Sequence, residues 1–223
     1  MVVVGILALQ GAFAEHVRAL TRLGTVTREV RVPADLDGAD ALIIPGGEST
    51  TIGKLLVLTG LDNAIRERAA AGLPIWGTCA GMILLGRDVG ASGSRVGVPQ
   101  TLLRLMDLCV RRNAFGTQLD SFETVLLAPT FAGDPIPAVF IRAPVIEEIG
   151  PGVEVLARLP DGRPVAVRQG RLLATAFHPE LTDDLAFHRY FVEVVSAGAD
   201  AKERQQPQTR PELGCRFRAD SSF

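Results

Sequence analysis

The chain has 223 residues, of which 47% are hydrophobic and 22% charged, and this composition is typical of a globular protein and excludes a disordered one. Its 23 Lys and Arg residues nearly balance 25 Asp and Glu residues, and the net charge of −2 argues against a protein that binds nucleic acid by neutralising phosphates. A compact chain of this length buries about 70% of the surface that it exposes when unfolded, so it needs no disulfides to hold a core.

The first 86 residues alternate between two hydrophobic patterns. Near-continuous apolar runs predict strands that are buried on both faces, and apolar residues at helical spacing predict amphipathic helices. The expected strands are residues 2–9, 26–32, 41–44 and 73–76, and the expected helices are residues 12–23, 50–58, 61–71 and 82–85. This alternation predicts a doubly wound α/β fold, in which a mostly parallel sheet is flanked by helices.

The rest of the chain shows shorter patterns that Pro and Gly interrupt. Residues 87–105 are rich in Gly and Ser and predict a loop. Strand patterns follow at residues 106–111, 122–127, 137–141, 153–159, 164–168 and 171–177, and a helical pattern at residues 184–196. We expect these strands to form an antiparallel extension at one edge of the sheet. Residues 1–197 would then form the single domain, and the polar residues 198–223 predict a disordered tail.

The cysteines and the N-terminus indicate where the protein works. Cys79, Cys109 and Cys215 are odd in number and widely spaced, which is typical of a reduced, intracellular protein. The N-terminal run MVVVGILAL is too short to span a bilayer and lacks a basic flank. We therefore expect a cytoplasmic protein without a membrane or nucleic-acid partner.

Three loops directly follow predicted strands. They are Gln10-Gly11, residues 45–49 and residues 77–81. Because ligands of doubly wound sheets bind beyond the carboxyl ends of the strands, we expect these loops to meet in one crevice.

The segment Gly77-Thr78-Cys79-Ala80-Gly81 has the G-x-nucleophile-x-G form of a nucleophile elbow. Glycines on both sides allow a tight turn, and the cysteine would stand at a helix N-terminus, where free N–H groups favour an anion. A cysteine taken alone is more often a small buried hydrophobe. The order of strand, turn and helix favours a nucleophile here.

A thiol nucleophile needs a base, and the base needs an orienting group. His178 and Glu180 flank a proline, so the carboxylate is close enough in sequence to orient the imidazole. His16 and His188 lie in predicted helices, where we interpret them as surface or capping residues. Whether His178 meets Cys79 depends on the fold.

The segment PGGEST at residues 45–50 is a second candidate loop. Its glycines would let backbone N–H groups face a developing oxyanion, together with the N–H of Ala80. The alternative is a simple turn before a helix that is capped by Ser49 or Thr50.

Six segments carry a resemblance to a known family. They are GILALQGAF at residues 5–13, PGGESTT at 45–51, GTCAG at 77–81, RNAFG at 112–116, FIRAP at 140–144 and FHPEL at 177–181. The elbow and the H-P-E segment resemble the class I, triad-type glutamine amidotransferases. The remaining segments resemble the glutaminase subunits of the pyridoxal 5′-phosphate synthases that work without deoxyxylulose phosphate, over residues 1 to about 196.

The resemblance implies a role for each matched residue. It implies a triad in which Cys79 is the nucleophile, His178 the base and acid, and Glu180 the orienting group. It implies oxyanion N–H groups from Gly47 and Ala80. The glutamine pocket would be lined by Gly47, Glu48, Ser49, Arg112, Ile141 and Arg142.

The implied chemistry is the hydrolysis of L-glutamine to L-glutamate and ammonia. Arg112 suits the carboxylate of a free amino acid, and Glu48 suits its ammonium group. No pair of Cys or His at ligand spacing indicates a metal, and no cofactor is implied. The implied partner is a (β/α)₈-barrel synthase subunit, which receives the ammonia. One departure from the pattern is Arg104, which stands where members of this family tend to have Gly.

Four alternatives stay open from the sequence. One is the glutaminase subunit of another synthase, such as imidazole glycerol phosphate synthase, which would use the same triad. A second is a catalytically silent subunit, against which the intact triad argues. The others are an elbow-cysteine enzyme of the deglycase or peptidase kind and a flavin-binding doubly wound domain, although the latter needs no elbow.

Overall fold

The structure is a computed structural model that describes residues 1–89, 100–112, 121–126, 128, 131 and 135–203. Its centre is a seven-stranded sheet in the order β10-β11-β12-β4-β3-β1-β2. The strands are β1 (Val3–Leu7), β2 (Val26–Val30), β3 (Ala41–Ile44), β4 (Ile75–Thr78), β10 (Glu154–Arg158), β11 (Pro164–Gln169) and β12 (Leu172–Thr175). The five strands from β12 to β2 are parallel, and β10 and β11 extend the sheet with antiparallel pairs.

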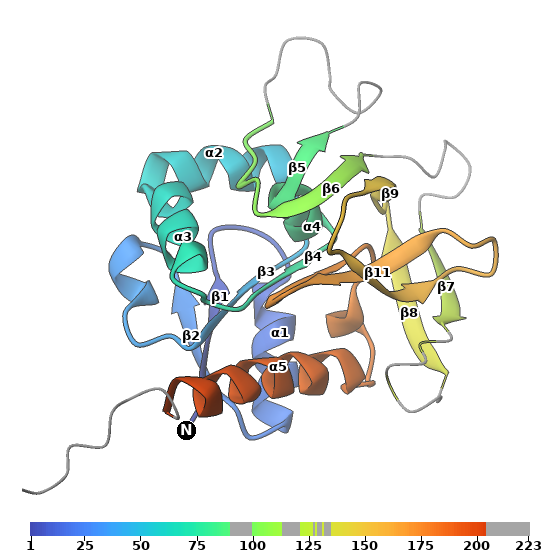
Figure 1. The fold of residues 1–223 in the computed structure, drawn as a ribbon. Helices are drawn as coiled ribbons and strands as arrows, with labels where there is room; N and C mark the ends of the chain where they lie inside the picture. Colours follow the sequence, from blue (N-terminus) through green and yellow to red (C-terminus); the bar gives the residue numbers. More distant parts are fainter. Residues whose placement is uncertain (90–99, 113–120, 127, 129–130, 132–134, 204–223) are drawn as a thin grey trace, which may run out of the picture.

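Helices cover both faces of this sheet (Figure 1). The helices are α1 (Phe13–Arg22), α2 (Ser49–Thr59), α3 (Leu61–Ala70), α4 (Ala80–Leu85) and α5 (Ala186–Glu203), with short 3₁₀ turns η1 (Pro33–Leu36) and η4 (Pro179–Leu181). In Figure 1, α1 and α5 lie on one side of the sheet, and α2, α3 and α4 lie on the other. The predicted doubly wound fold is therefore confirmed.

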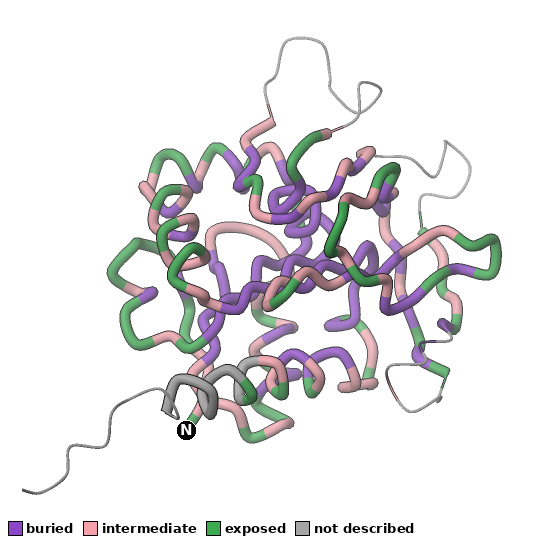
Figure 2. Tube along the Cα trace, in the orientation of Figure 1, coloured by how far each residue is buried: buried purple, intermediate pink, exposed green. Residues whose placement is uncertain are grey.

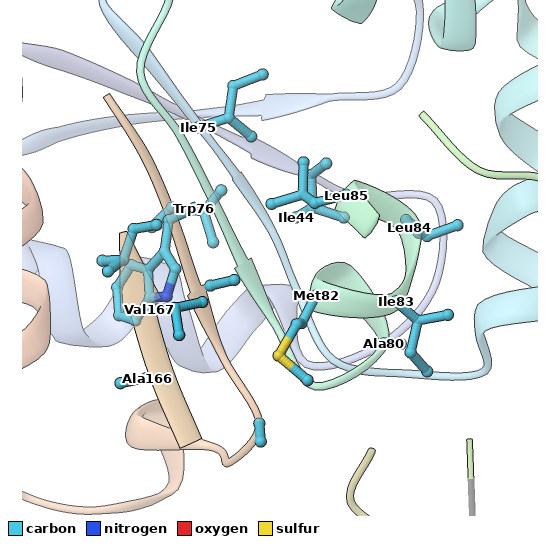
Figure 3. Packing of buried hydrophobic residues seen from close by; sticks show 14 of the residues in the cluster. Ile44, Ile75, Trp76, Ala80, Met82, Ile83, Leu84, Leu85, Ala166 and Val167 are labelled. Atoms are coloured by element: carbon cyan, nitrogen blue, oxygen red, sulfur yellow. The ribbon is translucent and has the colours of Figure 1, made fainter. Parts of the chain in front are cut away.

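The strands of the central sheet are hydrophobic because both of their faces are covered. Every residue of β3 and β4 is buried, and the buried part of the chain runs through the middle of the molecule in Figure 2. Trp76 on β4 packs toward α5, with its ring 5.6 Å from that of Phe191. Figure 3 shows Met82 and Leu85 of α4 beside the core side chains of β3 and β4.

The remaining strands differ from the prediction. Strands β5 (Gly86–Val89), β6 (Met106–Arg111) and β9 (Val145–Ile149) form a separate three-stranded sheet, and β7 (Ser121–Leu126) and β8 (Ile136–Ile141) form a two-stranded one. The edge extension is thus limited to β10 and β11. We predicted no strand at β9, because its two adjacent glutamates hide the apolar pattern, and β5 lies where we predicted the start of a loop.

The C-terminal part is described as far as α5. This helix continues to Glu203, beyond the expected start of the tail at residue 198. Residues 204–223 and most of the predicted Gly/Ser-rich loop lie outside the described residues. Within the described ranges, none of the helices has the length and hydropathy that a membrane-spanning segment requires.

Candidate active site

The three predicted loops meet in one cleft of about 700 Å³ at the carboxyl ends of the parallel strands. The loop after β1 contributes Gln10 and Gly11, and the loop after β3 contributes Gly46 and Gly47. Nine of the ten predicted site residues line this cleft: Gly47, Glu48, Ser49, Cys79, Ala80, Arg112, Ile141, Arg142 and His178. The tenth, Glu180, lies behind His178. The predicted crevice is therefore confirmed, whereas residues 113–116 of the RNAFG segment lie outside the described residues.

Cys79 stands on a strained turn between β4 and α4. Its φ of 48° and ψ of −102° lie outside the regions that L residues normally adopt. The flanking glycines are required by close backbone approach: a Cβ on Gly77 would lie 2.5 Å from the carbonyl of Gly81, and a Cβ on Gly81 would lie 2.1 Å from the carbonyl oxygen of Ile44. The elbow geometry holds the thiol at the cleft while the rest of α4 is buried.

His178 and Glu180 follow β12, the strand next to β4. The backbone N–H of His178 donates to the carbonyl of Val139 at 2.8 Å, which ties this segment to β8. The Nδ1 atom of His178 lies 2.8 Å from Oε1 of Glu180. The imidazole and Cys79 border the same glycine: a Cβ on Gly46 would lie 2.9 Å from Nδ1 of His178 and 3.3 Å from the Cβ of Cys79. The structure thus brings together three side chains from two neighbouring strand ends, which the sequence had left open and the family resemblance implied.

The electrostatics of this trio favour a protonated imidazole. Burial by itself lowers the pKa of His178, but hydrogen bonds to Cys79 and Glu180 and the negative charges of both groups outweigh it and raise the pKa to about 10. Burial raises the pKa of the Glu180 carboxyl, but the imidazoles of His16 and His178 and a backbone hydrogen bond outweigh it, so this pKa is lowered. Such an arrangement can hold a proton on the imidazole until a leaving group takes it.

The glycine loops after β1 and β3 are packed backbone to backbone. The carbonyl of Gly46 accepts a hydrogen bond from the N–H of Ala12 at 3.0 Å, which sets the orientation of the Gly46–Gly47 peptide. Gly11 adopts a φ of 108°, and a Cβ there would lie 1.9 Å from the oxygen of Gly46. Gln10 completes the contact, since its Oε1 accepts from the N–H of Glu48 at 2.8 Å. No residue other than glycine fits at this approach.

Glu48, and neither Ser49 nor Thr50, caps helix α2. Its carboxylate accepts from the N–H groups of Thr50 and Thr51 at 3.2 and 2.6 Å and from the Thr51 hydroxyl at 2.8 Å. Burial raises the pKa of Glu48, but these hydrogen bonds outweigh it and lower the pKa. Ser49 is instead buried, and its hydroxyl donates to Gln100. The alternative of a cap from Ser49 or Thr50 was therefore wrong, because the carboxylate of Glu48 reaches two helix N–H groups at once.

Arg112 reaches the cleft from the end of β6. Its guanidinium donates to Oε1 of Gln100 at 2.9 Å and to Oε1 of Glu48 at 3.2 Å. Gln100 in turn donates to the carbonyl of Ser49 at 3.1 Å. Gln100 was not among the predicted site residues, because it lies inside the Gly/Ser-rich segment of residues 87–105 and carries no signal of its own. Arg112 and Glu48 therefore place a positive and a negative charge side by side in the lining of the cleft.

Ile141 and Arg142 close the cleft from the end of β8. The thiol of Cys79 lies 3.9 Å from the carbonyl oxygen of Ile141, toward which it donates. Arg142 adopts a φ of 43°, a left-handed conformation that is costly for a residue with a side chain. The sharp turn that follows β8 therefore bears directly on the position of the thiol.

His16 and His188 are fully buried, and their interpretation as surface or capping residues was wrong. Nδ1 of His16 lies 3.0 Å from Nε2 of His188, and Nε2 of His16 lies 3.3 Å from Oγ1 of Thr78 and 3.5 Å from Oε2 of Glu180. His16 stands one helical turn before Leu20, on the apolar face of α1, and this spacing was a signal that it points inward.

In the described part of the chain, no three His, Cys, Asp or Glu side chains lie together in a way that could hold a metal ion. Cys109 lies on β6, and its side chain is outside the cleft. Burial and the nearby carboxylates of Glu148 and Asp88 raise the pKa of its thiol. Of the two cysteines in the described part of the chain, Cys79 is the one that lines the cleft.

Comparison with known proteins gives consistent results. The protein named pyridoxal 5′-phosphate synthase subunit PdxT from Herpetosiphon aurantiacus is 60% identical over 85% of this chain and 98% of that protein. The protein of the same name from Dehalococcoides mccartyi is 56% identical over 86% and 96%. A crystal structure described as a glutamine amidotransferase superposes with a TM-score of 0.80 at 50% identity, over 86% of this chain and 98% of that one.

A more distant structure, PurLQS from Thermotoga maritima, shares the fold at 17% identity, with a TM-score of 0.64 over 86% of this chain and 97% of that one. The sequence profile of the SNO glutamine amidotransferase family matches residues 6–197. This match covers most of the chain and includes both the elbow and the H-P-E segment. The chain belongs to the SNO glutamine amidotransferase family.

Proposed function

We propose that this chain is the glutaminase subunit of a pyridoxal 5′-phosphate synthase, and that it hydrolyses L-glutamine and passes the ammonia to a synthase subunit. The observation that carries the proposal is that Cys79 and His178 line the same cleft, with the His178 imidazole held at 2.8 Å by Glu180. The names of the similar proteins support the choice of synthase.

The reaction begins at the side-chain carboxamide of glutamine. The thiol proton resides on the His178 imidazole, and Sγ of Cys79 attacks the carboxamide carbon as the thiolate to form a tetrahedral oxyanion. The N–H groups of Gly47 and Ala80 stabilise this oxyanion: Ala80 is the first residue of α4, where N–H groups lack intrahelical acceptors. His178 then gives its proton to the nitrogen, the carbon–nitrogen bond breaks, and ammonia leaves a thioester on Cys79.

Water completes the turnover. His178 removes a proton from water as it attacks the thioester carbon, and the carbon–sulfur bond breaks to release L-glutamate. Glu180 keeps the imidazole in the orientation that both transfers need, and stabilises the imidazolium between them. No metal or cofactor takes part in this scheme.

The paired charges of Arg112 and Glu48 support recognition of a free amino acid. In the structure they contact one another at 3.2 Å at the cleft. A glutamine zwitterion would replace this contact with two: its carboxylate on the guanidinium and its ammonium on the Glu48 carboxylate. Ser49, Ile141 and Arg142 would line the walls around the side chain.

The partner in this proposal is a (β/α)₈-barrel synthase subunit in the cytoplasm. Free ammonia would be lost by protonation and diffusion, so the glutaminase is useful only when the acceptor is docked. The peptide between Gly46 and Gly47 can flip because both residues lack a Cβ, but the flip has to break the hydrogen bond from Ala12 to the Gly46 carbonyl. We therefore expect low glutaminase activity from the isolated chain and higher activity in the complex.

The test measures glutamate release from L-glutamine with and without the barrel synthase subunit. We expect release to rise with the partner and to fall at least about a thousandfold in the Cys79→Ala variant. The Cys109→Ala variant is the matched control and should keep the full rate. A folded wild-type chain that releases no glutamate in either mixture would refute the proposal and favour a silent subunit or another acyl substrate.

A further inference from the structure

Two buried histidines behind the triad have no part in the mechanism above. His16 on α1 and His188 on α5 are both fully buried, and their rings lie 5.1 Å apart between centroids. The ring of Trp76 lies 5.6 Å from that of His16 and 5.0 Å from that of His188, so an apolar wall excludes water from one side of the pair. Buried imidazoles are costly to keep unless their nitrogens have partners.

His16 and His188 extend the line of polar side chains that begins at Cys79 and runs through His178 and Glu180. His178 holds Oε1 of Glu180 at 2.8 Å, and on the other side Nε2 of His16 lies 3.5 Å from Oε2. The side chain of Glu180 is fully buried, and Oε2 has no partner within normal hydrogen-bond geometry in the described part of the chain. A buried carboxylate oxygen needs a donor, and Nε2 of His16 lies 3.5 Å from it.

The acceptor character of the carboxylate fixes which nitrogen of each histidine donates and which accepts. A carboxylate only accepts, so the nitrogen of His16 that faces Glu180, Nε2, carries the hydrogen. Burial lowers the pKa of His16, although Glu180 opposes this, so the ring is neutral and its Nδ1 must accept. His188 then donates from Nε2 across the 3.0 Å contact, and its Nδ1, which has no partner in the described chain, is left as an unprotonated acceptor.

His16 also contacts the strand that carries the nucleophile. Its Nε2 lies 3.3 Å from Oγ1 of Thr78, the residue immediately before Cys79. One nitrogen therefore lies between the carboxylate that orients the base and the residue that precedes the thiol. Two further charged groups act on His16: the His178 imidazole lowers its pKa, and Glu15 on the same helix raises it.

We propose that His16 is a positioning residue for the triad: its neutral Nε2–H holds Glu180 against His178 and links it to Thr78, and His188 selects the tautomer that does so. The proposal rests on the proposed function, because it assigns the pair to the same Cys79 chemistry. It explains why two imidazoles are buried here instead of apolar side chains of similar volume.

The experiment compares two amides at position 16 that differ only in reach. In His16→Gln the side-chain nitrogen takes the place of Nε2, so it still reaches Glu180. In His16→Asn the nitrogen takes the place of Nδ1 and faces His188 instead. Phe191→Leu is the control for the loss of packing, because Phe191 contacts Trp76 and no polar group of this line.

The first readout is glutamate release in the complex with the synthase subunit, per folded chain. We expect kcat to fall about 10- to 100-fold in His16→Asn with KM unchanged, because a hydrogen bond to a charged group is lost. His16→Gln and Phe191→Leu should stay within about threefold of the wild type. Equal kcat in His16→Asn and wild type, or equal losses in the Gln and Asn variants, would overturn the proposal.

The second readout needs neither substrate nor partner. The rate at which iodoacetamide alkylates Cys79, followed by mass spectrometry of its peptide, is measured against pH in the isolated chain. We expect the pH profile of His16→Asn to move to higher pH and that of His16→Gln to match the wild type. A wild type that does not hydrolyse glutamine would refute the proposed function, whereas identical alkylation profiles of all variants would refute the role of His16.

Discussion

The three histidines of this chain show that burial alone does not decide the charge of an imidazole. His178, His16 and His188 are all buried. Burial, together with the neighbouring His16, lowers the pKa of His188 to about 2, and burial also lowers the pKa of His16 against the opposing charge of Glu180. His178 contacts a thiol and a carboxylate, and these partners outweigh burial and raise its pKa to about 10. Burial lowers the pKa of an imidazole unless its neighbours outweigh it, as they do at His178.

This difference gives a prediction for His178. Removing the thiol in Cys79→Ala takes away a hydrogen bond and a negative charge that favour the imidazolium, so the pKa of His178 should fall from about 10. Titration of the imidazole resonances by NMR measures it. The Cys109→Ala variant should leave the pKa unchanged, and an unchanged pKa in Cys79→Ala would contradict the assigned contact.

At the scale of the elements, the site depends on how strands end and helices begin. The turn between β4 and α4 passes so close to the end of β3 that a Cβ on Gly81 has no room beside the carbonyl of Ile44. The same packing brings the N-terminus of α4 to the cleft. The backbone there stores strain at Cys79, which the surrounding core must hold in place.

The elbow glycines should therefore resist substitution. Gly81→Ala would place a methyl group 2.1 Å from the carbonyl oxygen of Ile44, and the strand or helix must move to admit it. We expect a loss of at least about 3 kcal/mol in the free energy of unfolding, as for severe overpacking. Urea unfolding measures it. Gly152→Ala is the control: its φ of 78° strains the variant, but no atom lies near the added carbon, so it should lose only about 1–2 kcal/mol. Equal losses would contradict the steric argument.

A second element carries strain outside the cleft. Arg104, between the described loop end and β6, is exposed and adopts a φ of 56°. This positive φ gives a physical reason for the Gly that the resembling family tends to have at this position. We expect Arg104→Gly to raise the free energy of unfolding by about 0.5–1 kcal/mol, since the left-handed conformation is free of strain only for glycine.

The matched variant for this position is Arg104→Ala. It removes the same side chain but keeps the Cβ, so it should give no gain. Urea unfolding of both variants beside the wild type separates the two effects. A gain in Arg104→Ala as large as that in Arg104→Gly would show that the side chain, and not the backbone, is the source of the strain.

At the scale of the whole molecule, the buried histidine pair ties stability to pH. The folded chain keeps His188 neutral with a pKa of about 2, whereas the unfolded chain binds a proton on it below about pH 6.5. The unfolded state therefore binds more protons in that range, and the free energy of unfolding falls as the pH is lowered. The slope from one such group is about 1.4 kcal/mol per pH unit.

The His188→Gln variant should lose this slope while it keeps a donor toward His16. We expect its free energy of unfolding to fall less steeply than that of the wild type between pH 6 and pH 4.5, by about 1.4 kcal/mol per unit. Urea unfolding at three pH values in this range measures both curves. Parallel curves would show that His188 is not buried in its neutral form.

Local patterns were sufficient where local rules decide the structure. The sequence predicted the bounds of β3, the order of strands and helices through α4, the elbow at Cys79, and the short step from His178 to Glu180, because each rests on hydrophobic periodicity or on glycine at a tight turn. The resemblance supplied roles for Gly47, Arg112 and Ile141, and the roles of these residues stay predictions. Strand β9 was missed because its glutamates mask its pattern.

Contacts between distant segments were decided by the tertiary structure. His16, Glu180 and His188 come from three elements at opposite ends of the chain, and nothing in their immediate neighbours states that they meet. The parallel pairing of β12 with β4 brings them together, since it places the H-P-E segment beside the elbow and between α1 and α5. Strand pairing over such separations depends on the packing of the whole sheet. The sequence alone therefore determined which residues were candidates for the chemistry, and the fold decided which of them are neighbours.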